Sequence, residues 1–217
     1  MKQLSVTFFG LLLSVSVMAQ ENLLDKSNQL FLKGAYDDAI ISYREAGEQL
    51  LASHQLGSYA TCHLNIGQCY LELGNIEAAV EQTKNTVGFI TSELPDQKNL
   101  LFDALLLEGE ALLKIGRNDE SLEILNQAEA LAPSQDPLDA AECYNDLGVG
   151  YWNNGNKELA LGYHEKALKI RQEALGDTAV QVANSYLNLG LVYLKEDYLD
   201  AVIAFTDALE IYKSQLG

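Results

Sequence analysis

The apolar residues of this chain recur at the spacing of α-helices rather than of strands. Tyr144, Leu147, Gly148 and Tyr151 follow one another at intervals of three, one and three residues, which places them on one helix face. A second stretch repeats this spacing with Ala160, Tyr163, His164, Ala167 and Ile170. Asn154-Gly155-Asn156 lies between the two stretches and is typical of a turn. The pattern therefore predicts two amphipathic helices joined as a hairpin.

The same hairpin pattern occurs five times along the chain. A small residue marks the first helix of each copy, at Ser27, Gly67, Gly109, Gly148 and Gly190, so the copies repeat every 39 to 42 residues. A small residue recurs in each second helix at Ala39, Ala79, Ser121, Ala160 and Ala201, and the residues four positions later are Tyr43, Thr83, Leu125, His164 and Phe205. Large side chains that meet small ones let two helix axes approach closely. One hairpin cannot bury its apolar face alone, so the copies are expected to stack.

This register resembles the tetratricopeptide repeat (TPR) family over about residues 21 to 216. The usual TPR period is about 34 residues, and the longer step here is similar to the variety of about 42 residues in kinesin light chains. Departures from the family pattern are Ser27 for glycine, Ser121 for alanine, His63 for an aromatic residue, and one residue missing near Glu196. The resemblance implies an all-α fold, a right-handed superhelical α-solenoid of five helix-turn-helix repeats. The copies are expected at about 21–56, 57–97, 98–135, 136–177 and 178–217.

The pair Gly148-Val149-Gly150 raises the question of a phosphate-binding loop. Such loops join a strand to a helix, whereas these glycines lie inside an amphipathic helix with no strand pattern before it. We therefore expect them to be helix-packing glycines. No Gly-x-Ser-x-Gly, Cys-x-x-Cys or His-x-x-x-His motif occurs, and Cys62 and His63 are adjacent and so face different sides of their helix. The chain is expected to be no enzyme and to hold no metal and no cofactor.

The first 19 residues have a different composition from the rest. Lys2 precedes an apolar stretch from Leu4 to Val17, and Val17-Met18-Ala19 then fits a cleavage site. These features are typical of a secretory signal peptide that is too short for a membrane span. Residues 20–217 would form the exported TPR array, in the periplasm of a Gram-negative bacterium or outside it, with no transmembrane span in the mature chain. The three cysteines, Cys62, Cys69 and Cys143, do not have the spacing of a disulfide framework and are expected to be buried free thiols.

The chain is strongly acidic, with a formal net charge of −17. A surface of this charge repels phosphate backbones, so we expect no nucleic-acid partner. Solubility or a basic partner accounts for the charge better.

Function is expected on the surface that the first helices of successive copies present. In this fold they line a concave groove, and in copy four the groove positions are Asn145, Val149, Trp152 and Asn153. Asn residues at 65 and 188 match positions where family members often hold a ligand backbone. The remaining groove candidates are Asn28, Phe31, Gln68, Leu71, Glu110, Leu113, Leu191 and Lys195. An apolar trough with amide groups suits an extended or helical peptide, and a half-exposed Trp is a typical binding hot spot.

The sequence thus predicts an exported scaffold that binds a protein or peptide segment in its groove. The alternative is the sensory or regulatory ectodomain of a larger protein, of the histidine kinase or caspase-like protease type. No polar capping helix follows the last copy, whose end at Gly217 matches Gly176 in copy four, where the chain continues into another repeat. Terminal repeats normally need such a cap, so self-association through the uncapped C-terminal repeat is a further expectation.

Overall fold

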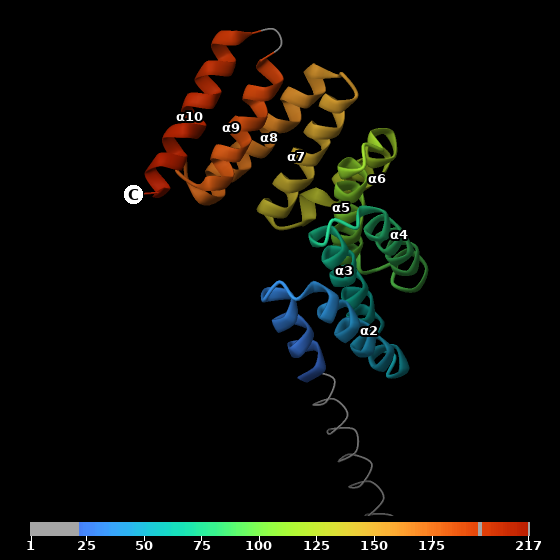
Figure 1. The fold of residues 1–217 in the computed structure, drawn as a ribbon. Helices are drawn as coiled ribbons and strands as arrows, with labels where there is room; N and C mark the ends of the chain where they lie inside the picture. Colours follow the sequence, from blue (N-terminus) through green and yellow to red (C-terminus); the bar gives the residue numbers. More distant parts are fainter. Residues whose placement is uncertain (1–21, 195–196, 217) are drawn as a thin grey trace, which may run out of the picture. The chain divides into compact units, whose positions relative to one another are not determined.

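The computed structural model describes residues 22–194 and 197–216 (Figure 1). The predicted signal peptide and Lys195 lie outside the described residues. Every regular element within the described residues is helical, so the all-α prediction and the helix-turn-helix organisation are confirmed. The chain divides into two compact units at residues 107 and 108, inside one helix, and each unit is described separately below.

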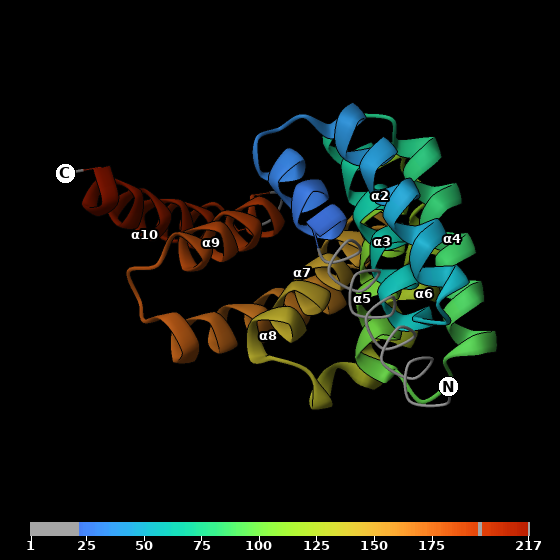
Figure 2. The ribbon, with the colours of Figure 1, turned by 90° about the horizontal axis from the view of Figure 1, so that it is seen from below.

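Unit 1 contains the first two hairpins. A helix over residues 22–32 is followed by α2 (Tyr36–Ala52), α3 (Leu56–Glu72), α4 (Ile76–Glu93) and the first part of α5 (Lys98–Lys114). Unit 2 contains the rest of α5, then α6 (Asn118–Leu131), the short 3₁₀ helix η1 (Ala132–Ser134), α7 (Pro137–Asn153), α8 (Lys157–Leu175), α9 (Val180–Tyr193) and α10 (Tyr198–Leu216). Figures 1 and 2 both show α9 and α10 side by side as an antiparallel pair.

The ends of the helices follow from local sequence. Pro137 occupies the first turn of α7, and the carboxylate of Asp136 accepts a hydrogen bond from the backbone N–H of Leu138 at 2.9 Å. The side chain of Asn156 caps α8 in the same way by accepting from the N–H of Leu159. Between these helices Gly155 has a φ of 77°, a conformation that glycine adopts at little cost. The predicted turn at Asn154-Gly155-Asn156 is therefore confirmed.

Each glycine that marks a first helix packs against a larger side chain of its partner helix. A Cβ added to Gly67, Gly109, Gly148 or Gly190 would lie 2.9, 2.4, 2.6 or 2.5 Å from Thr83, Leu125, His164 or Phe205, respectively. Real Cβ atoms do not approach other atoms that closely. The short distance between the paired helices therefore requires glycine at these positions. In copy one, where serine replaces glycine, the Ser27 hydroxyl instead donates to Ser42 Oγ at 2.8 Å inside the buried contact. The helix-packing interpretation of Gly148 is confirmed.

Gly150 packs on the other side of the same helix. A Cβ there would lie 2.8 Å from Leu122 of α6, the second helix of the preceding copy. Gly148 therefore allows close packing within one hairpin, and Gly150 allows it between neighbouring hairpins. The three cysteines are buried free thiols, as the sequence predicts, and burial raises the pKa of Cys62 and Cys69 to about 11. These thiols stay protonated at neutral pH and take part in the core.

Candidate functional site

In unit 1 the predicted groove residues contact other residues of the same unit. Tyr43 donates from its hydroxyl to Oδ1 of Asn28 at 2.7 Å, and Asn65 also hydrogen-bonds the buried Tyr43. Gln68 donates to Glu72 at 3.0 Å, one turn further along α3. Phe31 packs its ring edge against Tyr36 and Leu71 is 8 % exposed, so neither is a prominent surface residue. The groove assignment of these five residues stays a prediction, although their polar groups already have partners within the chain.

In unit 2 the predicted groove residues of two successive copies come together. Asn188 of α9 donates from Nδ2 to Oδ1 of Asn145 of α7 at 2.7 Å. Asn145 in turn donates from Nδ2 to Oδ1 of Asp146 at 3.3 Å. Both asparagines are half-buried, so this chain of side chains runs from the partly exposed amides of α7 and α9 to the buried Asp146.

Asp146 is the buried end of that chain and was not a predicted site residue. It is only 7 % exposed, and the bond from Asn145 is the one hydrogen bond that the described residues give its carboxyl group. Burial, with smaller contributions from Glu142 and Glu110, raises the pKa of Asp146 to about 8. This pKa favours the protonated form of the carboxyl group at neutral pH.

Arg171 of α8 is the buried cation of this region. Its Nη2 lies 2.6 Å from Oε2 of Glu142 on α7, and its Nη1 donates to Ser185 Oγ of α9 at 2.8 Å. One guanidinium group thus joins three successive helices at 5 % exposure. The guanidinium group forms an ion pair with Glu142. It also lowers the pKa of Asp146, but by less than burial raises it.

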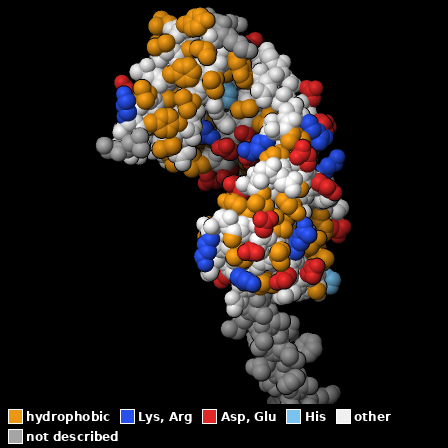
Figure 3. Space-filling model, viewed as in Figure 1, with side chains coloured by type: hydrophobic (Ala, Val, Ile, Leu, Met, Phe, Trp, Pro, Cys, Tyr) orange, Lys and Arg blue, Asp and Glu red, His pale blue; other side chains and the backbone are white. Residues whose placement is uncertain are grey.

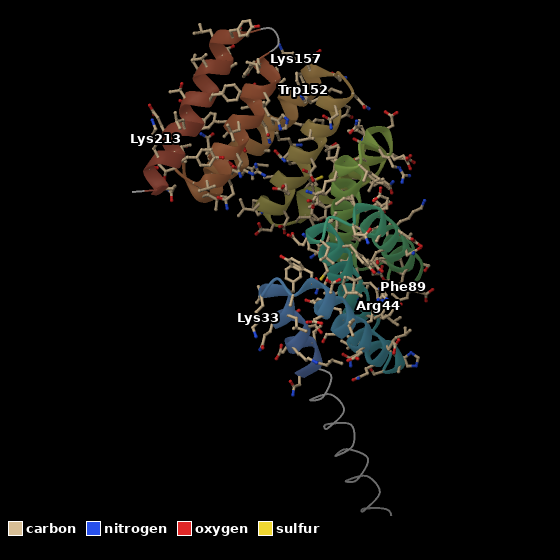
Figure 4. All side chains as sticks on the ribbon, viewed as in Figure 1. Lys33, Arg44, Phe89, Trp152, Lys157 and Lys213 are labelled. Atoms are coloured by element: carbon tan, nitrogen blue, oxygen red, sulfur yellow. The ribbon has the colours of Figure 1, made fainter. Side chains whose placement is uncertain are left out.

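The other predicted groove residues that the structure describes in unit 2 lie on α5, α7 and α9. Val149 and Trp152 are half-buried on α7, and Figure 4 shows Trp152 near the end of α7 that leads into the turn. Leu191 of α9 is 50 % exposed, and Leu113 of α5 is half-buried next to Gly150. Glu110 pairs with Lys114 at 3.3 Å. Asn153, the residue after Trp152, donates from Nδ2 to Oδ1 of Asn118 at 3.1 Å.

We call Glu110, Glu142, Asn145, Asp146 and Asn188 the amide–acid face of unit 2. Its free hydrogen-bonding capacity is mainly that of acceptors, because no described residue donates to Oδ1 of Asn188 and only Asn145 donates to Asp146. Carboxylates and amide oxygens accept from backbone N–H groups, ammonium groups and guanidinium groups. The face can therefore bind a ligand rich in donors, with Leu191 and Trp152 as apolar neighbours.

A signal for this face was present in the repeat register. Arg171 falls four residues after Ala167, where three other copies have the buried apolar residues Leu50, Ile90 and Ala132. Asn145 falls where the other four copies have leucine, at Leu24, Leu64, Leu106 and Leu187. A charge at a core position and an amide at a leucine position both indicate that copy four differs from the others. Comparing the copies position by position would have identified Arg171.

Within residues 22–194 and 197–216, no group of three or more His, Cys, Asp or Glu side chains could hold a metal ion. No helix in the described part of the chain is both long and apolar enough to cross a bilayer.

Known protein families account for the repeat. A family model described as Tetratricopeptide repeat matches residues 100–173 and 139–214, which together span more than half of the chain, and a second model of that description matches residues 60–82. The chain belongs to the tetratricopeptide repeat family. Members of this family mediate protein–protein interactions and are generally scaffolds without catalytic activity.

The most informative relatives agree on the fold. The chain is 27 % identical to the BBSome complex member BBS4 of Bos taurus over 184 residues, which cover 85 % of this chain and 30 % of that protein. A kinesin light chain repeat structure from Podosopora anserina has a TM-score of 0.73 at 16 % identity, covering 91 % of this chain and 96 % of that chain. A Rap protein solved with Competence and Sporulation Factor has a TM-score of 0.70 at 18 % identity, covering 86 % of this chain and 52 % of that chain. At such identities these structures establish the fold alone.

Proposed function

We propose that this TPR protein is an exported scaffold that binds a peptide segment carrying a basic side chain on its amide–acid face. The observation that carries the proposal is the chain of side chains Asn188–Asn145–Asp146 between α7 and α9. It offers acceptor groups on two successive repeats, and Arg171, the buried cation that the described residues place in this region, is held by Glu142.

The backbone and the side chain of the ligand have separate roles in this arrangement. The amide oxygen of Asn188 suits a backbone N–H of an extended peptide. A lysine or arginine side chain near Asp146 would favour the ionised carboxylate, because an opposite charge lowers the pKa of a carboxyl group. Trp152 and Leu191 supply apolar contact area on either side, and a half-buried Trp contributes strongly to such interfaces.

The relatives support peptide binding as a class of function. The Rap structure is a complex with Competence and Sporulation Factor, and a second Rap structure, of a plasmid conjugation gene regulator, is a complex with the Phr* peptide. The strongly acidic composition of this chain favours a basic ligand. Export rests on residues 1–19 alone, and an N-terminal sequence of the secreted protein that starts at Gln20 would support it.

A selection from a random peptide library tests the function. We expect peptides selected on residues 20–217 to be enriched in lysine and arginine relative to the library. Fluorescence anisotropy of a selected peptide should show at least tenfold weaker binding to Asn145→Ala/Trp152→Ala. Leu73→Ala/Asn126→Ala changes an exposed leucine and an exposed asparagine that belong to neither α7 nor α9, and it should bind like wild type.

The proposal is wrong if the folded Asn145→Ala/Trp152→Ala variant binds the selected peptides as tightly as wild type does. Selected peptides without lysine or arginine would remove the basic-ligand part of the proposal. Affinity for a basic peptide should also rise between pH 7 and pH 9, because ionisation of Asp146 then requires less free energy. Asp146→Asn should remove this pH dependence.

A further inference from the structure

The last helix of the described chain has an exposed apolar stripe. Tyr198, Leu199, Val202, Ile203 and Leu209 of α10 are 72, 69, 59, 50 and 49 % exposed. Their spacing of one, three, one and six residues places them on one side of α10. The opposite side, with Ala201, Ala204, Ala208 and Ile211, is buried in unit 2. Figure 3 shows hydrophobic side chains gathered over α9 and α10.

Part of the stripe occupies a repeat position that other copies bury or pack against the next first helix. Val202 matches Ile40, Val80, Leu122 and Leu161 in the second helices of the preceding copies. Ile40 and Val80 are 7 and 6 % exposed, and Leu122 packs against Gly150 of the next first helix. The Val202 position is therefore a helix-contact position that has no described helix on it.

The rest of the stripe is particular to α10. The residues that match Leu199 in the other copies are all acidic, namely Asp37, Glu77, Asp119 and Glu158. The residues that match Ile203 are Ile41, Glu81, Glu123 and Gly162. Burying a further first helix of the repeat does not require apolar residues at these two positions, since other copies do so with acids there. Leu199 and Ile203 widen the apolar face beyond what one more repeat would cover.

The opposite end of the array does not match this stripe. In the helix over residues 22–32, Lys26 and Gln29 are exposed. They occupy positions where the other copies bury Ile66, Glu108, Leu147 and Leu189, or Cys69, Ala111, Gly150 and Val192. Head-to-tail stacking of two copies would bury the Lys26 ammonium group against Val202 and its neighbours, which is unfavourable. A second copy is therefore expected to approach through its own α10.

We propose that two copies of this chain associate through their α10 stripes, packed antiparallel about a two-fold axis. In this register Val202 of each copy faces Leu209 of the other, and Thr206 lies next to the axis. Lys213, which Figure 4 shows near the C-terminal end of α10, comes close to the first turn of the partner helix. Asp197 caps that turn by accepting from the backbone N–H groups of Leu199 and Asp200. Each end of the helix pair thus combines opposite charges.

Sedimentation equilibrium of residues 20–217 tests the interface. We expect a dimer at micromolar concentrations, strengthened several-fold between 50 and 500 mM NaCl, because salt screens the repulsion between two acidic chains. Leu199→Asp/Ile203→Glu introduces the residues of copy three, Asp119 and Glu123, and should be monomeric with an unchanged helical circular dichroism spectrum. The matched control Ile41→Glu changes an isoleucine that is 59 % exposed at the same repeat position, and it should remain dimeric.

Disulfide trapping tests the orientation. Thr206→Cys should form an intermolecular disulfide under mild oxidation, because the two cysteines would lie together at the axis. Leu32→Cys introduces a thiol at another exposed position, a leucine of unit 1 that is 83 % exposed, and should not be trapped. A wild type that stays monomeric, including one that instead binds a synthetic peptide of residues 178–194, would overturn the dimer. A dimer that Leu199→Asp/Ile203→Glu leaves intact would overturn it as well.

Discussion

Asn188 donates from its side-chain amide to the side-chain oxygen of Asn145 at 2.7 Å, so the first helices of two successive repeats are joined at the surface by one hydrogen bond. These two residues are 43 positions apart, which is about one repeat. A ligand that contacts both amides therefore contacts two repeats at once, and it would stabilise their stacking when it binds.

The Asn145–Asn188 bond should contribute measurably to stability. Asn188→Ala and Asn145→Ala are each expected to lower the free energy of unfolding by about 1 kcal/mol, the usual net value of a hydrogen bond. The double variant should lose less than the sum of the two, because both single changes break the same bond. Urea unfolding of the four proteins measures this coupling, and strictly additive losses would show that the bond contributes nothing.

Gly148 should tolerate no side chain. Gly148→Ala places a Cβ 2.6 Å from the ring of the buried His164, and we expect a loss of about 1–3 kcal/mol from overpacking. For an array of this size that corresponds to a decrease of roughly 2–12 °C in Tm, taking about 2–4 °C per kcal/mol.

Gly162→Ala on α8 is the matched control for the glycine variant. Gly162 also lies inside a helix, but an added Cβ there meets no atom within 4 Å. The substitution should raise stability by about 0.5–1 kcal/mol through helix propensity alone. Equal effects of the two glycine variants in thermal unfolding would contradict the packing role of Gly148.

Asp146 should make stability depend on pH in alkaline solution. Its pKa in the folded chain is raised from 3.8 to about 8, so the folded state keeps a proton that the unfolded state loses. The contribution of Asp146 to stability therefore falls as pH rises from about 4 to about 8, and it is constant above that. At pH 9 Asp146→Asn should be more stable than wild type by about 2 kcal/mol or more. Unfolding curves at pH 5, 7 and 9 measure the effect, and Asp139→Asn, an exposed acid on the same helix, should not change the pH dependence.

His164 should have the opposite dependence in acid. Burial, with a smaller contribution from Arg171, lowers the pKa of His164 to about 4, so between pH 6.5 and pH 4 only the unfolded state takes up a proton. Stability from this residue is complete above pH 6.5 and is lost as pH falls towards 4. His164→Phe, the residue that copy five has at Phe205, should be more resistant to acid by about 2 kcal/mol at pH 4.5. His54→Asn changes an exposed histidine, and acid unfolding of that variant should match wild type.

The fold could be predicted from the sequence because the repeat register depends on small residues whose positions are fixed by helix packing. Gly67, Gly109, Gly148 and Gly190 each face a larger side chain on the partner helix, and that pairing was readable from spacing alone. Spacing also placed Asn145 and Asn188 on first helices of neighbouring copies. It could not show that their side chains bond to each other, because that depends on how far α7 and α9 are turned.

The burial of Asp146 could not be predicted from the pattern for a related reason. Asn145 and Asp146 are adjacent polar residues, and a helix can bury either of them after a rotation of about 100°. In the structure Asp146 is the buried one, and the Arg171 guanidinium, which bridges Glu142 and Ser185, is near enough to affect its pKa. In unit 1 the sequence pattern could not show that Asn28 and Asn65 hydrogen-bond the hydroxyl of Tyr43, because this partner lies on another helix.

The residues that face the marker glycines differ in volume from copy to copy, from Thr83 through Leu125 and His164 to Phe205. A chain built from similar hairpins risks pairing a second helix with the first helix of the wrong copy. Each mispairing would put a side chain of the wrong size against a glycine, leaving a void beside Gly190 or a clash beside Gly67. The variation among these four side chains therefore favours the correct pairing of first and second helices in each hairpin during folding.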